Sequence, residues 1–172
     1  MTYTCAIETP LGTMTAAAEE GAITGLWFIG QKYYPAATAS WAWEPDYPVF
    51  TVLLSHLSRY FAGETLGCDL PLALHGSAFR KSVWEILRKI PFGQVVTYGD
   101  IARTIARAGG LASMSAQAVG GAVGHNPISI LIPCHRVVGA DGSLTGYAGG
   151  MERKEALLRL EGVVRPTRSQ KR

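Results

Sequence analysis

The chain has 172 residues, a hydrophobic fraction of 48% and a formal net charge of +3, which permit a substantial apolar core and only weak attraction to polyanions. The three cysteines, Cys5, Cys68 and Cys134, are odd in number and far apart, which argues against the disulfide framework of a small secreted protein. Residues 1–10 lack the pattern of a signal peptide and no apolar run is long enough to cross a membrane, so we expect a soluble, intracellular protein without membrane contact.

The first part of the chain has the pattern of short strands followed by one helix. Alternating apolar residues between turns predict an antiparallel meander of three strands, at residues 3–7, 14–18 and 23–29. Residues 31–48 are rich in aromatic residues and proline but show no periodicity, so we expect an irregular connection that packs Trp41 and Trp43 on the sheet. Pro48 begins a helix that Gly63 ends.

A loop at residues 67–76 separates this part from a region of different character. Ser77 is placed to cap a helix with one apolar face, and Pro91 stops that helix. We therefore divide the chain into an N-terminal mixed α/β domain at residues 1–76, a mostly helical domain at residues 77–164, and a basic, disordered tail at residues 165–172.

Two short helices joined by a glycine turn have the outline of a helix-turn-helix. Thr97 or Asp100 opens the first helix, and Ser113 caps the second, at residues 114–123. Small residues leave the second helix almost without side chains: Ala116, Ala118, Gly120, Gly121 and Ala122. Tight internal packing would explain small residues on one face, whereas small residues on several faces favour close approach of the backbone to a narrow groove of DNA.

Residues 130–138 place Pro133-Cys134-His135-Arg136 between two apolar runs. A cysteine among aliphatic residues is often a small buried hydrophobe. Here, however, Arg136 and a charged His135 would lower the pKa of the Cys134 thiol and make it nucleophilic. We therefore favour a reactive thiol.

Cys134 as nucleophile, His135 as base and Glu161 as the group that orients the base form a three-part activated thiol. Glu161 lies in the last turn of a helix predicted at residues 151–161, where the helix dipole disfavours it, so we expect a histidine partner. In an extended segment adjacent side chains point to opposite sides, so proton transfer needs a turn before the cysteine or a bridging water. Asn126, one apolar strand upstream, is placed to tie such a turn together.

The glycine-rich residues 143–150 lack the spacing and the strand-to-helix context of a phosphate-binding fingerprint. We interpret them as a mobile loop that places Tyr147 against a ligand, with a plain connector as the alternative.

These motifs resemble the O6-alkylguanine-DNA alkyltransferases. The resemblance covers residues 79–162, and its matching motifs lie at residues 92–102, 118–124, 126–127, 132–137, 146–150, 157–158 and 161–162. It implies an α+β protein with an N-terminal antiparallel sheet and helix arranged as in ribonuclease H. It also implies a mostly helical C-terminal domain that carries the helix-turn-helix and the Pro-Cys-His-Arg segment.

The resemblance implies DNA repair by one irreversible transfer. A guanine alkylated at O6 would be flipped out of the duplex, and Cys134 would take its alkyl group. His135 would accept the thiol proton through a water while Glu161 holds the imidazole. Asn126 would brace the turn, and Tyr98 would give a proton to the base. Activity on O4-alkylthymine stays open.

The resemblance also implies binding residues. Around the base it places Val137, Tyr147 and Ala148. On the DNA it places Ser113, Ser115, Gln117, Ala118, Gly120, Gly121 and Arg136. Gln117 stands where the family often has an arginine that fills the space of the flipped base, so we expect weaker or more salt-sensitive binding from this position.

The implied partner is double-stranded DNA that carries O6-alkylguanine, bound through its minor groove. We expect a monomer in the cytoplasm, at the nucleoid, with cooperative assembly on DNA left open. Cys5 lies where some relatives have a zinc ligand, but no other ligands accompany it, so we predict no metal and no cofactor.

Two other functions fit the same residues. A Cys-His-Glu hydrolase would use these groups for acyl transfer and would turn over repeatedly. A non-catalytic binder of alkylated DNA would share the fold but would not need the acceptor cysteine. The residues alone leave the first function open, and single-use kinetics would discriminate against it. The presence of Cys134 argues against the second.

Overall fold

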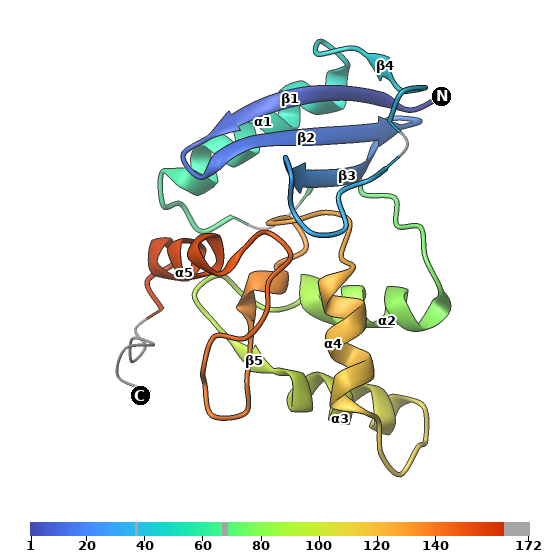
Figure 1. Ribbon diagram of the computed structural model, residues 1–172, viewed down its shortest axis with the longest axis vertical. Coiled ribbons are helices and arrows are strands. Elements are labelled where there is room, and N and C mark those ends of the chain that lie inside the picture. The colour runs from blue at the N-terminus through green and yellow to red at the C-terminus, as the bar shows by residue number, and fades with distance from the viewer. Residues whose placement is uncertain (37, 67–68, 164–172) are drawn as a thin grey trace. The chain divides into compact units, whose positions relative to one another are not determined.

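The computed structural model describes residues 1–36, 38–66 and 69–163 (Figure 1). The chain forms two compact units. The first contains Met1–His75 together with Pro127–Leu131, and the second contains Gly76–Asn126 and the chain from Ile132 onward. The predicted disordered tail and Cys68 lie outside the described residues. None of the helices in the described ranges is long and apolar enough to cross a membrane.

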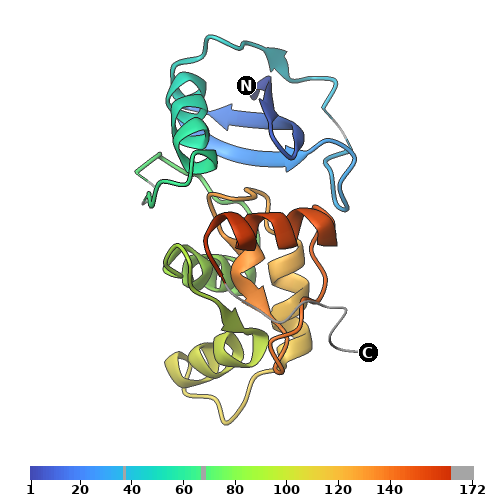
Figure 2. The same cartoon turned by 90° about the vertical axis from the view of Figure 1, so that its left-hand side faces the viewer.

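The first unit is a four-stranded sheet with one helix. Three antiparallel strands confirm the predicted meander, and a fourth, short strand pairs in parallel with β1 to give the order β3-β2-β1-β4. The strands are β1 (Tyr3–Thr9), β2 (Gly12–Glu19), β3 (Ala22–Phe28) and β4 (Ala42–Trp43). The helix α1 (Pro48–Phe61) begins at proline as predicted and lies along the sheet (Figure 2).

The connection before α1 differs from the prediction at one of its two tryptophans. Trp41 stacks on Trp27 with ring centroids 5.9 Å apart, so this residue packs on the sheet as expected. Trp43 is 64% exposed. Because Ala42 and Trp43 form the edge strand β4, their side chains alternate between its faces, and Trp43 points to solvent.

Up to residue 163, the second unit contains four α-helices: α2 (Ala78–Arg88), α3 (Tyr98–Ala108), α4 (Ala116–Gly124) and α5 (Met151–Leu160). The Ser77 hydroxyl accepts a hydrogen bond of 3.1 Å from the Arg80 amide, which confirms the predicted cap of α2. Helix α4 packs against α2 and α3, and the Trp84 indole donates a 2.8 Å hydrogen bond to the Ala122 carbonyl. Helix α4 is therefore anchored by a buried polar contact as well as by apolar packing.

The caps of α3 and α4 define the helix-turn-helix outline. Thr97 and Asp100 form a reciprocal capping box at the start of α3, so both predicted residues take part. The prediction that Ser113 caps α4 is wrong. Ser115 caps it, because its hydroxyl accepts a 3.1 Å hydrogen bond from the Ala118 amide and the helix begins two residues later than predicted.

The segment between α4 and Cys134 is a turn that belongs to the first unit, whereas the sequence predicted an apolar strand within the second domain. The Leu26 amide donates to the Pro127 carbonyl and the Ser129 amide donates to the Leu26 carbonyl, each at 2.9 Å. The Leu131 amide then donates to the Ser129 carbonyl at 2.8 Å, and Ile130 has a φ of 70°. A positive φ at a β-branched residue costs about 1–3 kcal/mol, so the surrounding contacts must hold this turn.

Candidate active site

Cys134 begins a short 3-10 turn, η1 (Cys134–Arg136). The Cys134 amide donates to the Ile132 carbonyl at 2.8 Å, and the Arg136 amide donates to the Pro133 carbonyl at 2.9 Å. The buried Asn126 side chain donates a 2.7 Å hydrogen bond to the same Ile132 carbonyl. The structure therefore contains a turn at the cysteine, and the Asn126 side chain ties it as the sequence predicted.

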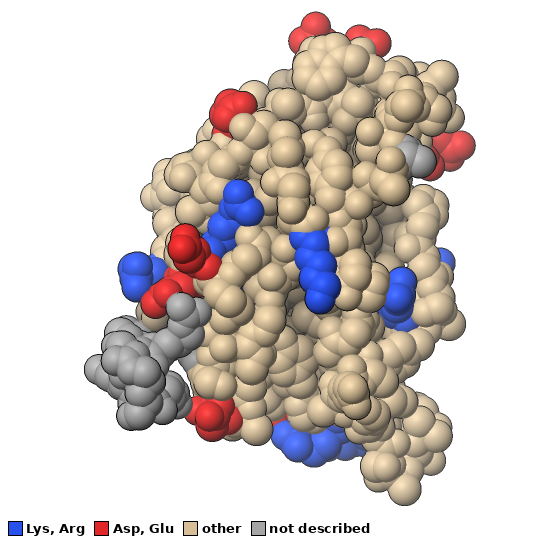
Figure 3. Space-filling view, viewed as in Figure 1, with Lys and Arg blue, Asp and Glu red and all other residues tan. Residues whose placement is uncertain are grey.

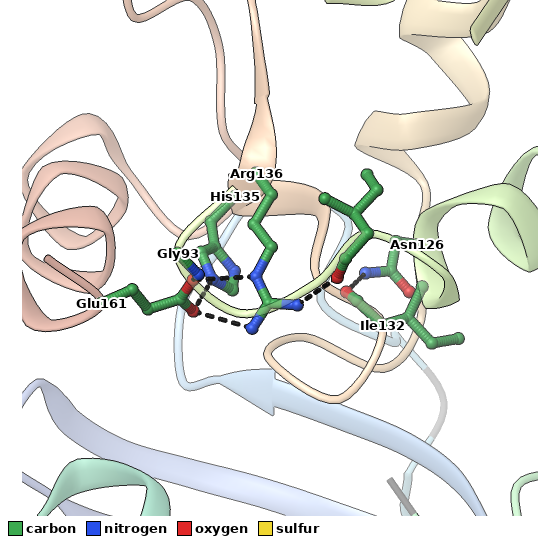
Figure 4. Close-up of polar contacts among 7 residues, drawn as sticks. Gly93, Asn126, Ile132, His135, Arg136 and Glu161 are labelled. Carbon is green, nitrogen blue, oxygen red and sulfur yellow. Dashed lines mark hydrogen bonds and ion pairs between the residues drawn. The ribbon is translucent and has the colours of Figure 1, made fainter. Parts of the chain in front are cut away.

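Glu161 holds the two residues that follow the cysteine (Figure 4). Its Oε2 lies 2.7 Å from Nε2 of His135, and Arg136 donates to Oε1 and Oε2 at 2.9 Å each. The Gly93 amide donates to Oε1 at 3.0 Å. The histidine partner of Glu161 is thus confirmed, whereas sequence reasoning missed Arg136 and Gly93. A bidentate guanidinium fixes the carboxylate plane, and the carboxylate in turn fixes the imidazole.

The charge states in this cluster follow from burial and pairing. Burial would raise the pKa of Glu161, but hydrogen bonds from His135, Arg136 and the Gly93 amide outweigh it and hold that pKa well below the usual 4.5. Burial lowers the pKa of His135 below 6.5, against the opposing pull of Glu161, and the Arg136 charge adds to the lowering. Glu161 is therefore ionised and His135 is neutral at physiological pH.

The Cys134 thiol is protonated in this resting state. Burial raises its pKa, and the hydrogen bond with Asn126 and the charge of Lys154 only partly oppose that effect. The expectation that cations lower the pKa of Cys134 below its ordinary value is therefore wrong, because His135 is neutral and desolvation dominates. A protonated thiol beside a neutral imidazole is suited to transfer of the proton at the moment of reaction.

A second short sheet brings Tyr98 to the cysteine. Strands β5 (Val96–Thr97) and β6 (Val137–Val138) pair in parallel, which sets the start of α3 beside the end of η1. Burial raises the pKa of Tyr98, and the neighbouring Cys134 adds to this, so the phenol keeps its proton. The Thr145 hydroxyl donates to the Tyr98 oxygen at 3.2 Å. The structure thus places a protonated phenol in the neighbourhood of Cys134.

The residues expected around the base come from two segments. Val137 is fully buried in β6, and Tyr147 and Ala148 are half-buried in the loop at residues 143–150. Lys154 of α5 reaches back to this loop, with Nζ 3.3 Å from the Thr145 carbonyl and 3.2 Å from the Gly146 carbonyl. Sequence reasoning missed Lys154. Its spacing was the available signal, since it lies on the apolar face of α5, seven residues before Glu161.

Most of the residues expected to contact DNA lie at the surface of α4 and the turn before it. Exposed members of this set are Ser113, Ser115, Gln117, Ala118 and Gly121, while Gly120 is half-buried against the Tyr98 ring. A Cβ atom added at Gly121 would meet nothing within 4 Å. In Figure 3 the lysine and arginine side chains on the visible face form separate groups, and most of that face consists of residues without a positive or negative charge.

Arg136 does not fit the expectation that it contacts DNA. Its side chain is 9% exposed, and Nη1 donates to the Ile90 carbonyl at 2.6 Å while the other donors bind Glu161. Its guanidinium therefore stabilises the active-site cluster from inside the unit. The prediction failed because a sequence shows the charge of a residue but not the carboxylate that pairs with it.

Two further features belong to the first unit, a buried cysteine and a surface pocket. Burial raises the pKa of Cys5 to about 11, so that its thiol stays protonated. Across residues 1–36, 38–66 and 69–163, no group of three histidine, cysteine or acidic residues is placed to hold a metal ion. A surface pocket of about 470 Å³ in the first unit lies between α1 and residues 69–71, and none of the predicted catalytic residues lines it.

Two family models match the chain in succession. Residues 1–74 match the ribonuclease-like domain of 6-O-methylguanine DNA methyltransferase, and residues 78–163 match its DNA-binding domain. The ribonuclease-like arrangement expected for the N-terminal part is therefore confirmed.

Individual proteins show the same similarity along most of their length. The chain is 45% identical over 155 residues to the methylated-DNA–protein-cysteine methyltransferase of Mycobacterium bovis, covering 90% of this chain and 89% of that protein. It is 41% identical to the protein of that name from Methanosarcina acetivorans, covering 93% and 98%. Among solved structures, Mycobacterium tuberculosis OGT in complex with DNA has a TM-score of 0.81 at 42% identity, covering 93% of this chain and 91% of that one.

Proposed function

Because the chain belongs to the 6-O-methylguanine DNA methyltransferase family, we propose that Cys134 is the residue that accepts the alkyl group. The protein repairs DNA by taking an alkyl group from O6 of guanine onto one of its own cysteines. The sulfur attacks the alkyl carbon, a carbon–sulfur bond forms, and the bond from that carbon to O6 breaks. The thioether that results is a poor leaving group, so each molecule acts once.

The proton balance uses Cys134, His135 and Tyr98, and Glu161 supports the histidine. The thiol proton of Cys134 passes to neutral His135 through a water, and Glu161 stabilises the imidazolium that forms. The departing guanine gains negative charge, and Tyr98 donates a proton to its N3 side. The raised pKa of Tyr98 supports this role, because the phenol stays protonated until the base needs the proton.

The flipped base is recognised by backbone and loop groups. The carbonyls of Cys134 and Val137 accept hydrogen bonds from the exocyclic amine of guanine. The Ala148 amide faces O6, and Tyr147 flanks the ring. The partial burial of Tyr147 and Ala148 supports this placement, because residues that line the edge of a binding site are neither fully buried nor fully exposed.

Helix α4 enters the minor groove of the DNA. The open space at Gly121 and the exposure of Ala118 support close backbone approach, and Gln117 fills the place of the flipped base. Ser113 and Ser115 contact the sugar–phosphate backbone. We propose a monomeric protein in the cytoplasm that binds damaged double-stranded DNA without a cofactor.

The observation that carries this function is the buried Cys134 thiol beside a neutral histidine that Glu161 holds at 2.7 Å. The test is mass spectrometry after incubation with duplex DNA that contains O6-methylguanine. We expect one methyl group per protein, located on Cys134, and a repaired guanine. An unmodified protein with intact damaged DNA would contradict the proposal, and repeated turnover would point to a hydrolase.

The Cys134→Ala variant separates transfer from binding. It should bind the damaged duplex with nearly wild-type affinity and leave the methyl group on the DNA. The Cys5→Ala variant is the matched control, because Cys5 is also buried but lies in the first unit, and it should transfer the methyl group normally.

A further inference from the structure

Lys154 is a fully buried lysine in the second unit. It lies in α5 at helical spacing with the buried residues Leu157, Leu158 and Glu161, so its stem occupies the apolar face of the helix. Lysine is almost never fully buried unless polar groups hold its charge. A position of this kind needs an explanation beyond packing.

The ammonium group of Lys154 binds the loop that precedes α5. It donates to the Gly146 carbonyl at 3.2 Å and to the Thr145 carbonyl at 3.3 Å. Thr145 donates in turn to the Tyr98 oxygen at 3.2 Å. One charged group therefore connects α5 to the loop and, through Thr145, to the start of α3.

The same charge acts on the reacting groups. Burial raises the pKa of Cys134, and the charge of Lys154 opposes this effect. The other charged or titratable groups around the thiol are His135 and Arg136 of η1, Tyr98 of α3 and Glu161 after α5. The Arg136 charge is paired with Glu161, so Lys154 is the cation whose charge favours the Cys134 thiolate directly.

We propose that Lys154 is a positioning residue for alkyl transfer: its ammonium group fixes residues 145–146 so that Tyr98, Tyr147 and Ala148 meet the flipped base, and its charge favours the Cys134 thiolate. The inference rests on the proposed function for its chemical consequence. Its structural part, the ordering of the loop, holds independently of that function.

The alternative is that Lys154 only completes the fold of α5. Methionine is close to lysine in length, is flexible and fills apolar space, and the two carbonyls that Lys154 binds carry no charge, so Lys154→Met should fold. The Lys154→Arg variant keeps the charge and the donors. The matched control is Arg159→Met, which removes an exposed cation from the same helix.

The first measurement is the single-turnover rate of methyl transfer at saturating damaged DNA across pH. Near neutral pH we expect Lys154→Met to be about tenfold slower than wild type, with a rate that recovers as pH rises, because the thiol then ionises without the lysine. Lys154→Arg should restore most of the rate, Arg159→Met should match wild type, and the affinity for DNA should be unchanged in all three.

The second measurement is amide hydrogen exchange of residues 144–148. Exchange should accelerate in Lys154→Met and not in Arg159→Met. The same rate, pH profile and exchange in both variants would overturn the proposal, and so would a loss of DNA affinity that accounts for the slower transfer. If wild type transfers no methyl group, the proposed function fails, and the exchange experiment still decides whether Lys154 orders the loop.

Discussion

Nε2 of His135 lies 2.7 Å from Oε2 of Glu161, and both side chains are completely excluded from solvent. Because the same carboxylate binds the Arg136 guanidinium at both oxygens, one buried acid holds the proposed base of the reaction and neutralises a buried cation. Stability and chemistry therefore depend on the same residue. A buried ion pair adds little net stability when intact, but removing one partner leaves an uncompensated charge.

We expect Glu161→Ala to destabilise the protein by about 3–5 kcal/mol, because Arg136 would remain buried without its carboxylate. Urea unfolding measures this change. The matched control is Glu155→Ala, which breaks an exposed pair with Arg159 on the same helix and should cost less than about 1 kcal/mol. Equal effects of the two substitutions would contradict the central role of Glu161.

The free energy of unfolding should decrease in two steps as the pH is lowered. His135 is kept neutral by the fold, so the unfolded chain binds more protons once pH drops below its ordinary pKa of 6.5, and stability decreases from there. The lowered pKa of Glu161 adds a second decrease below 4.5, where the unfolded carboxyl takes up a proton and the folded one does not. Urea unfolding at a series of pH values measures both steps.

The first step should be assigned with two histidine variants. His135→Gln should remove most of the dependence that begins at 6.5. His56 also has a pKa that burial lowers, so His56→Gln should remove a smaller part, in keeping with its partial burial. A wild-type stability that stays constant from neutral pH down to about 5 would show that His135 is not held neutral.

Much of this architecture follows from local pattern. Period-two apolar residues predict β1 to β3, and Ser77 and Thr97 predict helix starts because caps are short-range signals. The two-residue strands β4, β5 and β6 carry no periodicity, and only tertiary pairing defines them. The same distinction explains the turn at Ile130. Its sequence predicts an apolar strand, but its shape depends on the hydrogen bonds that Pro127 and Ser129 make with Leu26 just before it.

The site divides in the same way. Cys134, His135, Glu161 and Asn126 are brought together as their chemistry predicts. The partners of a charge are less predictable, since Arg136 looks like a surface cation until Glu161 is placed beside it. Lys154 was missed because a lysine in a helix is usually exposed to solvent, even where leucines surround it in the sequence. Its helical spacing with Leu157 and Leu158 indicates burial, but the carbonyls that it binds are visible only in the structure.

Gly121 offers a test of the surface of α4. A Cβ atom there meets nothing within 4 Å and the residue has no positive φ, so Gly121→Ala should stabilise the helix by about 1 kcal/mol. A leucine would also fit the free protein but would stand between α4 and the DNA. We therefore expect Gly121→Leu to fold normally and to lose DNA affinity about tenfold or more. Unchanged affinity, measured by fluorescence anisotropy, would place the DNA elsewhere.

Gln117 offers the sharpest test of how this chain engages damaged DNA. It is exposed at the start of α4, and its amide lacks the charge that an arginine would bring to the space left by the flipped base. A charge-assisted hydrogen bond is about twice as strong as a neutral one, so Gln117→Arg should bind the damaged duplex about tenfold more tightly.

Any added positive charge would also attract DNA non-specifically. The control is therefore Gln94→Arg, which adds the same charge at another exposed position of the second unit. Fluorescence anisotropy at several salt concentrations should show the full gain for Gln117→Arg and a small one for Gln94→Arg. Equal gains would mean that the added charge acts at long range and that Gln117 does not face the flipped base.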